Sequence, residues 1–380
     1  MTSPAPKFEP LVPAIESGPP PAAASNRIVS LDVFRGLTIA AMILVNNPGS
    51  WDDVYGPLTH AQWNGWTAAE LVFPFFLFIV GVAITFSLGA APRNHARIGR
   101  RTLLLFALGL GLNALGGFES FATLRIPGVL QRIALCYLAA SLLFLHTGPR
   151  GQALSLCGLL VGYWAMLDLV PVGGSSPGWL DPERNVTALI DRRLLGAGHL
   201  YHETWDPEGL LSTIPAIATT LFGVLAGHRL RFARTARAKT LGLAAAGAAV
   251  IATGLVFDRW MPINKNLWTS SYVVFTAGMA VLLFALCYWL VDVKEVRRPV
   301  VPLVVFGVNP IAVYVLSTAG GALMDATTIR GMNLRERICH ALFAGWSSPP
   351  AASLLFALGY VLFWLAVMSV LYRRKIFLRI

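Results

Sequence analysis

The chain has 380 residues, of which 56% are hydrophobic and only 13% are charged. Soluble domains carry about 25% charged residues, so this composition excludes a disordered chain and an ordinary soluble enzyme. The formal net charge is +11, which can indicate a nucleic-acid-binding protein. Here, however, the basic residues lie in short gaps between apolar runs, as in the cytoplasmic loops of membrane proteins. We therefore expect membrane lipid, and no nucleic acid, around this chain.

Residues 1–26 are rich in Pro, Ala and Ser and contain no apolar core of a signal peptide. This composition predicts a disordered tail. Residues 27–380 are then expected to form a single transmembrane domain.

Ten apolar segments follow, each close to the ~20 residues that a bilayer requires. The expected spans are 28–47, 68–91, 101–117, 126–146, 152–171, 210–228, 240–257, 270–291, 300–319 and 351–372. Lys and Arg gather in alternate gaps, with the gap at 320–350 as an exception. This alternation predicts an even number of spans with both termini in the cytoplasm. The expected fold is an all-α polytopic membrane protein of about ten helices.

Ionisable residues inside the spans are costly and therefore mark candidate sites. Asp32 and Arg35 are three residues apart on one helical face of the first span and can pair. Arg132 lies well inside the fourth span and must face a partner or a water-filled cavity. Asn309 interrupts the ninth span. For Asp32 and Arg35, a purely structural ion pair near the membrane interface is an equally good interpretation.

The densest polar stretch comes directly before the second span. It comprises His60, Gln62, Trp63, Asn64, Trp66, Thr67 and Glu70. Histidine exchanges protons near neutral pH, whereas Trp and Asn can wall and orient a substrate. Asn46, at the end of the first span, is expected on the same membrane face and close enough to reach this polar stretch. The alternative is an interfacial aromatic belt with an incidental histidine.

Two further polar clusters are expected on the same membrane face, before the sixth and eighth spans. They contain Asp206, Glu208, Asn264, Lys265 and Asn266. Asp206 followed by proline is also a good helix N-cap, so capping is an open alternative. A pocket built from distant segments explains the clusters together.

Searches for metal and nucleotide motifs are negative. The four cysteines form no CxxC pair, and Walker A, HExxH and GxSxG patterns do not occur. His199 and His202 are three residues apart, but neighbouring carboxylates alone do not make a metal site. We expect no metal cofactor.

The polar motifs together resemble a known family. The matching stretches are SLDVFRGL, MILVNN, HAQWNGWTAAELVFPFFLFIVG, IPGVLQRIAL, WDPEGLLSTIP, INKNLWTSSYV and GVNPIAVYV, in this order between residues 28 and 318. The chain is similar to the catalytic membrane domain of the heparan-α-glucosaminide N-acetyltransferase family and its bacterial relatives. The order and polarity of these motifs make the resemblance specific.

The resemblance implies transfer of an acetyl group from cytoplasmic acetyl-CoA to an amino sugar or oligosaccharide on the periplasmic side of a bacterial inner membrane. It implies that His60 is the active-site histidine and that Asn46 lies beside the acetyl group. Glu70 stands where the family often has Asp, so the carboxylate is kept on a longer stem. A homodimer is also implied.

Chemistry at these residues leaves two mechanisms open. His60 could act as a general base or carry the acetyl group covalently, and direct transfer is the favoured interpretation. Asn46 or Asn64 could donate to the oxyanion, a role worth roughly 3–4 kcal/mol. Residues expected to contact the acceptor are Trp63, Asn64, Glu70, Asp206, Glu208, Asn264, Lys265 and Asn266.

Acetyl-CoA, as the acetyl donor, requires cationic or polar contacts, for which Arg35, Arg132 and Asn309 are the candidates. The basic residues Arg93, Arg97, Arg100 and Arg101 could serve the phosphates of CoA, although topology anchoring explains them equally. Two other functions remain open at this point. One is an O-acyltransferase of envelope polysaccharide, and the other is a sugar transporter whose path is lined by Arg132 and Asn309.

Overall fold

The computed structural model describes residues 28–89, 94–116, 120–172, 178, 180–232 and 235–378. The predicted disordered tail at 1–26 and Arg93 lie outside the described residues.

The described chain is built almost entirely of helices. In chain order they are α1 (Val29–Asn46), α2 (Ala68–Ser87), α3 (His95–Leu115), α4 (Val129–His146), α5 (Pro149–Leu169), α6 (Val186–Leu195), α7 (Thr213–Phe232), α8 (Ala236–Phe257), α9 (Ser270–Tyr288), α10 (Val301–Val308), α11 (Pro310–Ala326), α12 (Leu334–Cys339) and α13 (Pro349–Arg373). Short 3-10 turns cover Gly56–Leu58 and Ala197–His199, and π turns follow α9 and α12 at Trp289–Val293 and His340–Ala344. Strands β1 (Thr328–Ile329) and β2 (Met332–Asn333) form a two-stranded antiparallel hairpin. The predicted all-α polytopic fold is confirmed.

Each of the ten expected spans coincides with a helix, but fewer of them meet the length and hydropathy of a membrane span. Within the described residues, eight helices do, and a ninth is added if α10 and α11 form one span bent by 85°. Helix α7 has 20 residues but is not among them. His228, Arg229 and Arg231 at its end lower its mean hydropathy. The expected span at 210–228 nevertheless coincides with a helix of sufficient length.

Two pairs of helices meet backbone to backbone through reciprocal glycines. Gly36 of α1 and Gly307 of α10 form one pair, and Gly81 of α2 and Gly223 of α7 form the other. A Cβ at any of these four positions would lie within 2.0 Å of a backbone oxygen of the facing helix. Small residues that let helix backbones approach closely are the usual contact in membrane bundles. We call these contacts the two glycine seams.

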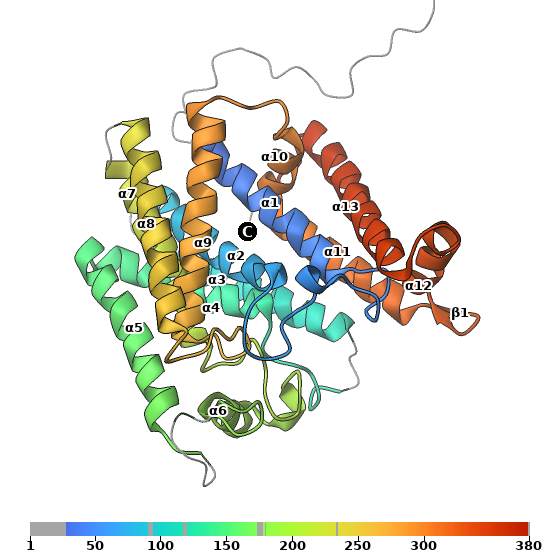
Figure 1. Ribbon diagram of the computed structural model, residues 1–380, viewed down its shortest axis with the longest axis horizontal. Helices are drawn as coiled ribbons and strands as arrows, with labels where there is room; N and C mark the ends of the chain where they lie inside the picture. The colour runs from blue at the N-terminus through green and yellow to red at the C-terminus, as the bar shows by residue number, and fades with distance from the viewer. Residues whose placement is uncertain are drawn as a thin grey trace, which may run out of the picture.

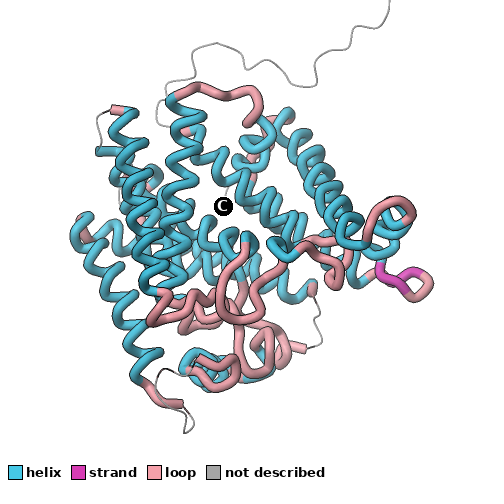
Figure 2. Tube along the Cα trace, viewed as in Figure 1, coloured by secondary structure: helices cyan, strands magenta, loops and turns pink. Residues whose placement is uncertain are grey.

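The loops that carry the polar motifs gather at one end of the bundle. The segments 47–67, 196–212 and 258–269 lie together at the lower end of Figure 1, and Figure 2 shows the same concentration of loops. The start of α1 and the end of α13 both lie at the upper end. The fold therefore brings together polar segments that are up to 200 residues apart in sequence.

Candidate active site

Glu70 is the centre of the polar end of the bundle. It is the third residue of α2, and it forms a capping box with Thr67, the N-cap residue. Thr67 N donates to Glu70 Oε2 over 2.6 Å, and Ala61 N donates to Oε1 over 3.1 Å. The Glu70 side chain is only 1% exposed. The local sequence rule that starts α2 thus also buries a carboxylate beside His60.

His60 is bound to this carboxylate through one ring nitrogen. His60 Nδ1 lies 2.6 Å from Glu70 Oε1. Because an ionised carboxylate only accepts, the ring proton sits on Nδ1 and leaves Nε2 with a free lone pair. The His60 side chain is 45% exposed. This arrangement presents Nε2 as a proton acceptor or nucleophile at the surface of the polar end.

The 258–269 loop packs against the loop that carries His60. Asn264 Nδ2 donates to Asn64 Oδ1 over 3.0 Å, and the two segments are also joined by a backbone hydrogen bond. Lys265 Nζ lies 3.3 Å from Nδ1 and 3.4 Å from Nε2 of His60. Burial lowers the pKa of Lys265, against the opposing effect of nearby carboxylates. The loop therefore places a partly desolvated amine against the histidine.

An ion cluster joins the 196–212 segment to the loop before α4. Arg125 Nε and Nη2 donate to the two oxygens of Asp206 over 2.8 and 2.7 Å, and Nη2 also donates to Glu208 over 2.5 Å. Burial opposes ionisation of Arg125, but hydrogen bonds to these carboxylates raise its pKa. The bidentate geometry fixes the segment. Asp206 does not cap a helix, as one interpretation predicted, because α7 begins only at Thr213.

Aromatic side chains connect this ion cluster to the His60 loop. The rings of Trp63 and Trp205 meet edge to face with centroids 5.1 Å apart, and Trp63 Nε1 donates to Leu180 O. Trp63, Asn64, Glu70, Asp206, Glu208, Asn264 and Lys265 thus belong to one continuous polar end. Among the described residues, Asn266 forms no hydrogen bond or ion pair within it.

Arg132 belongs to this end of the bundle and not to the donor side where it was predicted. It is 1% exposed, donates to Gly209 O and Ser212 Oγ, and stacks 4.7 Å from the centroid of the Trp268 ring. Its Nε and Nη1 have no hydrogen-bond partner. A buried guanidinium with two unused donors is costly, which marks this point as one where a polar ligand would be stabilised.

Asp191 of α6 holds the turn that supports Arg132. Its Oδ1 accepts hydrogen bonds from Leu210 N and Leu211 N over 2.9 and 3.2 Å. Burial raises the pKa of Asp191 to about 6, although these backbone hydrogen bonds oppose the shift. The turn before α7 is therefore fixed by a carboxylate whose ionised form is disfavoured by burial.

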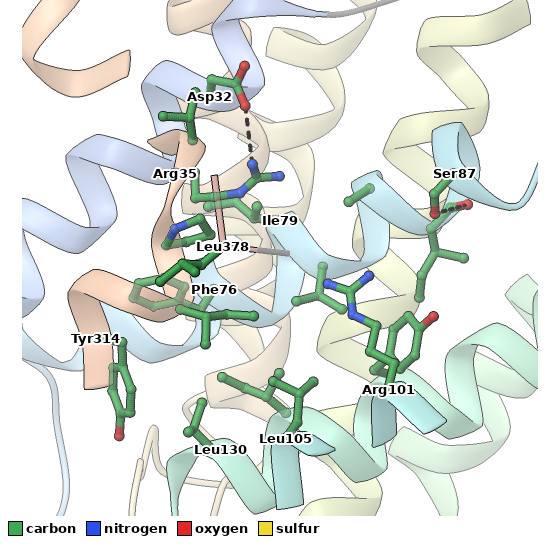
Figure 3. A pocket seen from close by; sticks show the side chains of 18 of the residues that line it. Asp32, Arg35, Phe76, Ile79, Ser87, Arg101, Leu105, Leu130, Tyr314 and Leu378 are labelled. Atoms are coloured by element: carbon green, nitrogen blue, oxygen red, sulfur yellow. Dashed lines mark hydrogen bonds and ion pairs between the residues drawn. The ribbon is translucent and has the colours of Figure 1, made fainter. Parts of the chain in front are cut away.

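A cavity of about 460 Å³ lies between α1, α2, α3, α4 and α11. Three arginines, Arg35, Arg97 and Arg101, line it together with apolar side chains. Figure 3 shows the guanidinium groups of Arg35 and Arg101 on opposite sides of the same space. Arg35 donates to Asp32 over 3.1 Å, whereas Arg101 Nε is buried without a hydrogen-bond partner. The cavity combines an apolar wall with positive charge, which suits an anionic group on an apolar arm.

Asn309 closes one side of this cavity without lining it. It is fully buried at the 85° break between α10 and α11. Its Nδ2 donates to Ile376 O over 2.9 Å, and its Oδ1 accepts from Leu378 N over 3.0 Å. Phe377 and Leu378 are lining residues of the cavity. Asn309 therefore holds the 376–378 segment in place as a wall.

The cavity and His60 are separate in this structure. His60 is not a lining residue, and the lining residue of α2 that comes nearest to Glu70 in sequence is Phe76. Six helical residues correspond to about 9 Å. Asn46 is exposed at the end of α1, and no hydrogen bond joins it to His60 among the described residues. No residue that lines the cavity in the described part of the chain belongs to the 47–67 segment that carries His60.

The sequence did not reveal several supporting contacts. Tyr272 Oη of α9 donates to Glu70 O over 2.6 Å, and Trp205 and Ser212 become visible only through their contacts. A buried Tyr in an apolar helix carries no local signal of such a partner. Within the described ranges, no group of three His, Cys, Asp or Glu side chains could hold a metal ion.

Fold and site define a polytopic α-helical membrane protein with an imidazole–carboxylate pair at one end and an arginine-lined cavity in the bundle. Residues 27–171 match a family model described as "Heparan-alpha-glucosaminide N-acetyltransferase, catalytic". The human protein named heparan-alpha-glucosaminide N-acetyltransferase is 29% identical across 93% of this chain and 60% of its own length. The mouse protein of that name is 30% identical across 77% of this chain and 53% of its own length.

These comparisons confirm the resemblance predicted from the motifs: the chain is similar to heparan-α-glucosaminide N-acetyltransferases along most of its length. The chain spans between about half and three-fifths of the length of these relatives.

Proposed function

We propose that this protein is a transmembrane acetyltransferase that moves the acetyl group of acetyl-CoA to the amine of an amino sugar on the opposite side of the membrane. The observation that carries the proposal is the pairing of His60 with Glu70 at one end of a bundle that encloses an arginine-lined cavity. The proposed sites of the donor and the acceptor thus lie in one chain.

His60 acts as the general base. Its Nδ1–H is held by Glu70, so Nε2 accepts the proton that the acceptor amine loses as its nitrogen attacks the thioester carbonyl carbon. The C–S bond then breaks, and the CoA thiolate leaves and takes up a proton. Glu70 stabilises the imidazolium that forms during the attack. Asn46 or Asn64 donates to the carbonyl oxygen as it gains negative charge.

The donor occupies the cavity from the side of Arg97 and Arg101. Their guanidinium groups neutralise phosphate charge, and the apolar wall accommodates the pantetheine arm. Because the cavity reaches Phe76 but not His60, transfer requires the wall between Phe76 and Glu70 to open when the donor binds. In this proposal the membrane is a bacterial inner membrane, as the resemblance implies, and the loop charges favour an orientation with this cavity facing the cytoplasm and His60 the periplasm.

The acceptor is held at the polar end. Glu208 and the unused donors of Arg132 supply acidic and basic groups for sugar hydroxyls and the amine. Asp206, whose side chain is 0% exposed, supports them by holding Arg125. Trp63 and Trp205 supply an aromatic wall on which the apolar face of a sugar ring can pack.

The test uses protein reconstituted in lipid vesicles, with radiolabelled acetyl-CoA on one side and glucosamine trapped on the other. We expect labelled N-acetylglucosamine from the wild type and at least a 100-fold slower rate from His60→Ala. His340→Ala, an exposed histidine after α12, is the matched control and keeps the wild-type rate. Wild-type turnover in His60→Ala would refute the assigned base, and no product with the wild type would refute the function.

The donor cavity is tested separately by filling it. Ala83 lines the cavity, so Ala83→Trp is expected to raise KM for acetyl-CoA at least tenfold because the indole occupies the space of the donor. Leu103→Trp, on an α3 side chain that is 71% exposed, is the control of equal size. Equal KM values in the two variants would place the donor elsewhere.

A further inference from the structure

The position of Lys265 relative to His60 is unusual for a hydrogen bond. Nζ lies almost equally far from Nδ1 and Nε2, at 3.3 and 3.4 Å. The lone-pair directions of the two ring nitrogens diverge, so one atom cannot be in line with both. An equidistant approach in the ring plane would collide with Cε1. Nζ therefore lies over the face of the imidazole, as in a cation–π contact.

The loop holds Lys265 in this position through its neighbours. Asn264 is fully buried, and its Oδ1 accepts a hydrogen bond from Leu267 N over 2.8 Å. Thr269 Oγ1 accepts from Asn264 N over 3.0 Å. Trp268 has a φ of 52°, in the left-handed region. A turn fixed by these contacts leaves the lysine little freedom to move away from His60.

The charged groups around His60 come from several elements. Glu70 of α2 approaches in the ring plane at Nδ1, and Lys265 covers the ring face. Glu208 and Arg132, on the 196–212 segment and α4, act on Lys265 electrostatically. Lys265 forms no ion pair within 4.0 Å in the part of the chain that the structure describes. The carboxylates of Glu208 and Glu70 favour the ammonium form of Lys265, and Arg132 opposes it.

We propose that Lys265 is a positioning residue that keeps His60 in its neutral, proton-accepting form. A cation over the ring disfavours a second positive charge on the imidazole, whereas the Glu70 carboxylate favours it. Glu70 and Lys265 therefore act on the protonation of His60 in opposite directions. This inference rests on the function proposed above, because it concerns the protonation of its general base.

The kinetic test compares Lys265→Met and Lys265→Arg in the acetyl-transfer assay as a function of pH. Removal of the positive charge stabilises imidazolium, so the acid limb of the kcat/KM profile of Lys265→Met is expected to move to higher pH by about one unit. Lys265→Arg keeps the charge and the wild-type limb, and Arg259→Met removes an exposed cation of the same loop without moving it. An unmoved limb in Lys265→Met, or an equal shift in Lys265→Arg, would overturn the proposal.

A second measurement does not depend on activity. The imidazole nitrogens of ¹⁵N-histidine-labelled protein are titrated by NMR, with His60→Gln used to assign the His60 signals. We expect the His60 midpoint to rise by about one pH unit in Lys265→Met and to stay constant in Arg259→Met. A constant or lower midpoint in Lys265→Met refutes the role of Lys265. If the midpoint rises but the wild type transfers no acetyl group, the proposed function fails while the electrostatic coupling stands.

Discussion

The two candidate regions of the bundle differ in how their charged groups are paired. At the polar end, Glu70 accepts several hydrogen bonds and Arg125 is held by two carboxylates, whereas the buried Nε and Nη1 of Arg132 have no hydrogen-bond partner. In the cavity, Arg35 is paired with Asp32, and the buried Nε of Arg101 has no hydrogen-bond partner.

Paired and unpaired charged groups have different energetic consequences. Groups that are already paired hold a fixed geometry at no further cost, which suits a reacting centre. Unpaired buried donors carry a desolvation cost that a bound anion would remove. The paired groups around Glu70 are therefore preorganised, whereas Arg132 at the polar end and Arg101 in the cavity each keep a buried donor that a ligand could satisfy.

The largest effect is expected from Glu70→Gln. The amide can donate where His60 Nδ1 already donates, so the ring turns or changes tautomer, and kcat falls by about 10³-fold or more, by analogy with other imidazole–carboxylate pairs. Glu70→Asp keeps the carboxylate and is the matched control, with a smaller loss. Steady-state kinetics measure both. Equal losses in the two variants would show that the charge at residue 70 is not what fixes His60.

Loss of a paired cation at the same end should appear in stability. Arg125→Met leaves the Asp206 carboxylate, whose side chain is 0% exposed, without its partner, and we expect unfolding to become easier by about 3 kcal/mol. Thermal unfolding in detergent measures this loss. Arg193→Met, on an exposed α6 arginine, is the control. An unchanged unfolding temperature for Arg125→Met would contradict the view that this end is preorganised by its own ion pairs.

The cavity should respond in the opposite manner. Arg101→Ala removes an unsatisfied donor together with the contact of the guanidinium with the Tyr137 ring, 4.8 Å from its centroid. We therefore expect a loss of stability of no more than about 1 kcal/mol, whereas KM for acetyl-CoA rises by about 10- to 100-fold through loss of a charged hydrogen bond. Arg150→Ala, on an exposed arginine of α5, tests for a general charge effect. If Arg101→Ala lost more stability than this and bound the donor normally, the contrast between the two regions would disappear.

The smallest effect concerns Asp191. Its pKa is raised to about 6, compared with about 3.9 in an unfolded chain. A carboxyl with a raised native pKa costs stability above that pKa, and the cost disappears as the pH falls through about 6 toward 4. Asp191→Asn should therefore exceed the wild type in stability by about 1–2 kcal/mol at pH 7.5, and by less at pH 5.

The measurement for Asp191 is the difference in unfolding temperature between variant and wild type at the two pH values. Because the other titrating groups are the same in both proteins, their contributions are removed when the two unfolding temperatures are subtracted. A difference that grows as the pH falls would mean that the wild-type carboxylate is stabilised by its surroundings.

Much of the architecture could be predicted from the sequence because each membrane span is specified by its own residues. A run of apolar residues specifies a helix whatever its partners are, and the i, i+3 pairing of Asp32 with Arg35 is equally local. Helix α7 lies below the hydropathy of a membrane span because His228, Arg229 and Arg231 lie at its end.

The candidate site divides in the same way. Glu70 and His60 are only ten residues apart: a capping box fixes Glu70 against Thr67, and Ala61 N and His60 Nδ1 then meet the Glu70 carboxylate. The positions of Arg132 and Asn309 could not be predicted, because their partners are 77 and 67 residues away in the chain. A charged or amide side chain in an apolar run indicates that a hydrogen-bond partner is required, but the sequence does not identify that partner.

The two glycine seams determine which helices are held in contact. At Gly36–Gly307 and Gly81–Gly223 the backbones touch, so α1 with α10, and α2 with α7, must move as rigid blocks. Gly109 of α3 instead faces the side chain of Gln131. The helix that carries Glu70 is therefore held against α7 at a backbone contact, and a side chain larger than glycine at residue 81 or 223 would force these two helices apart.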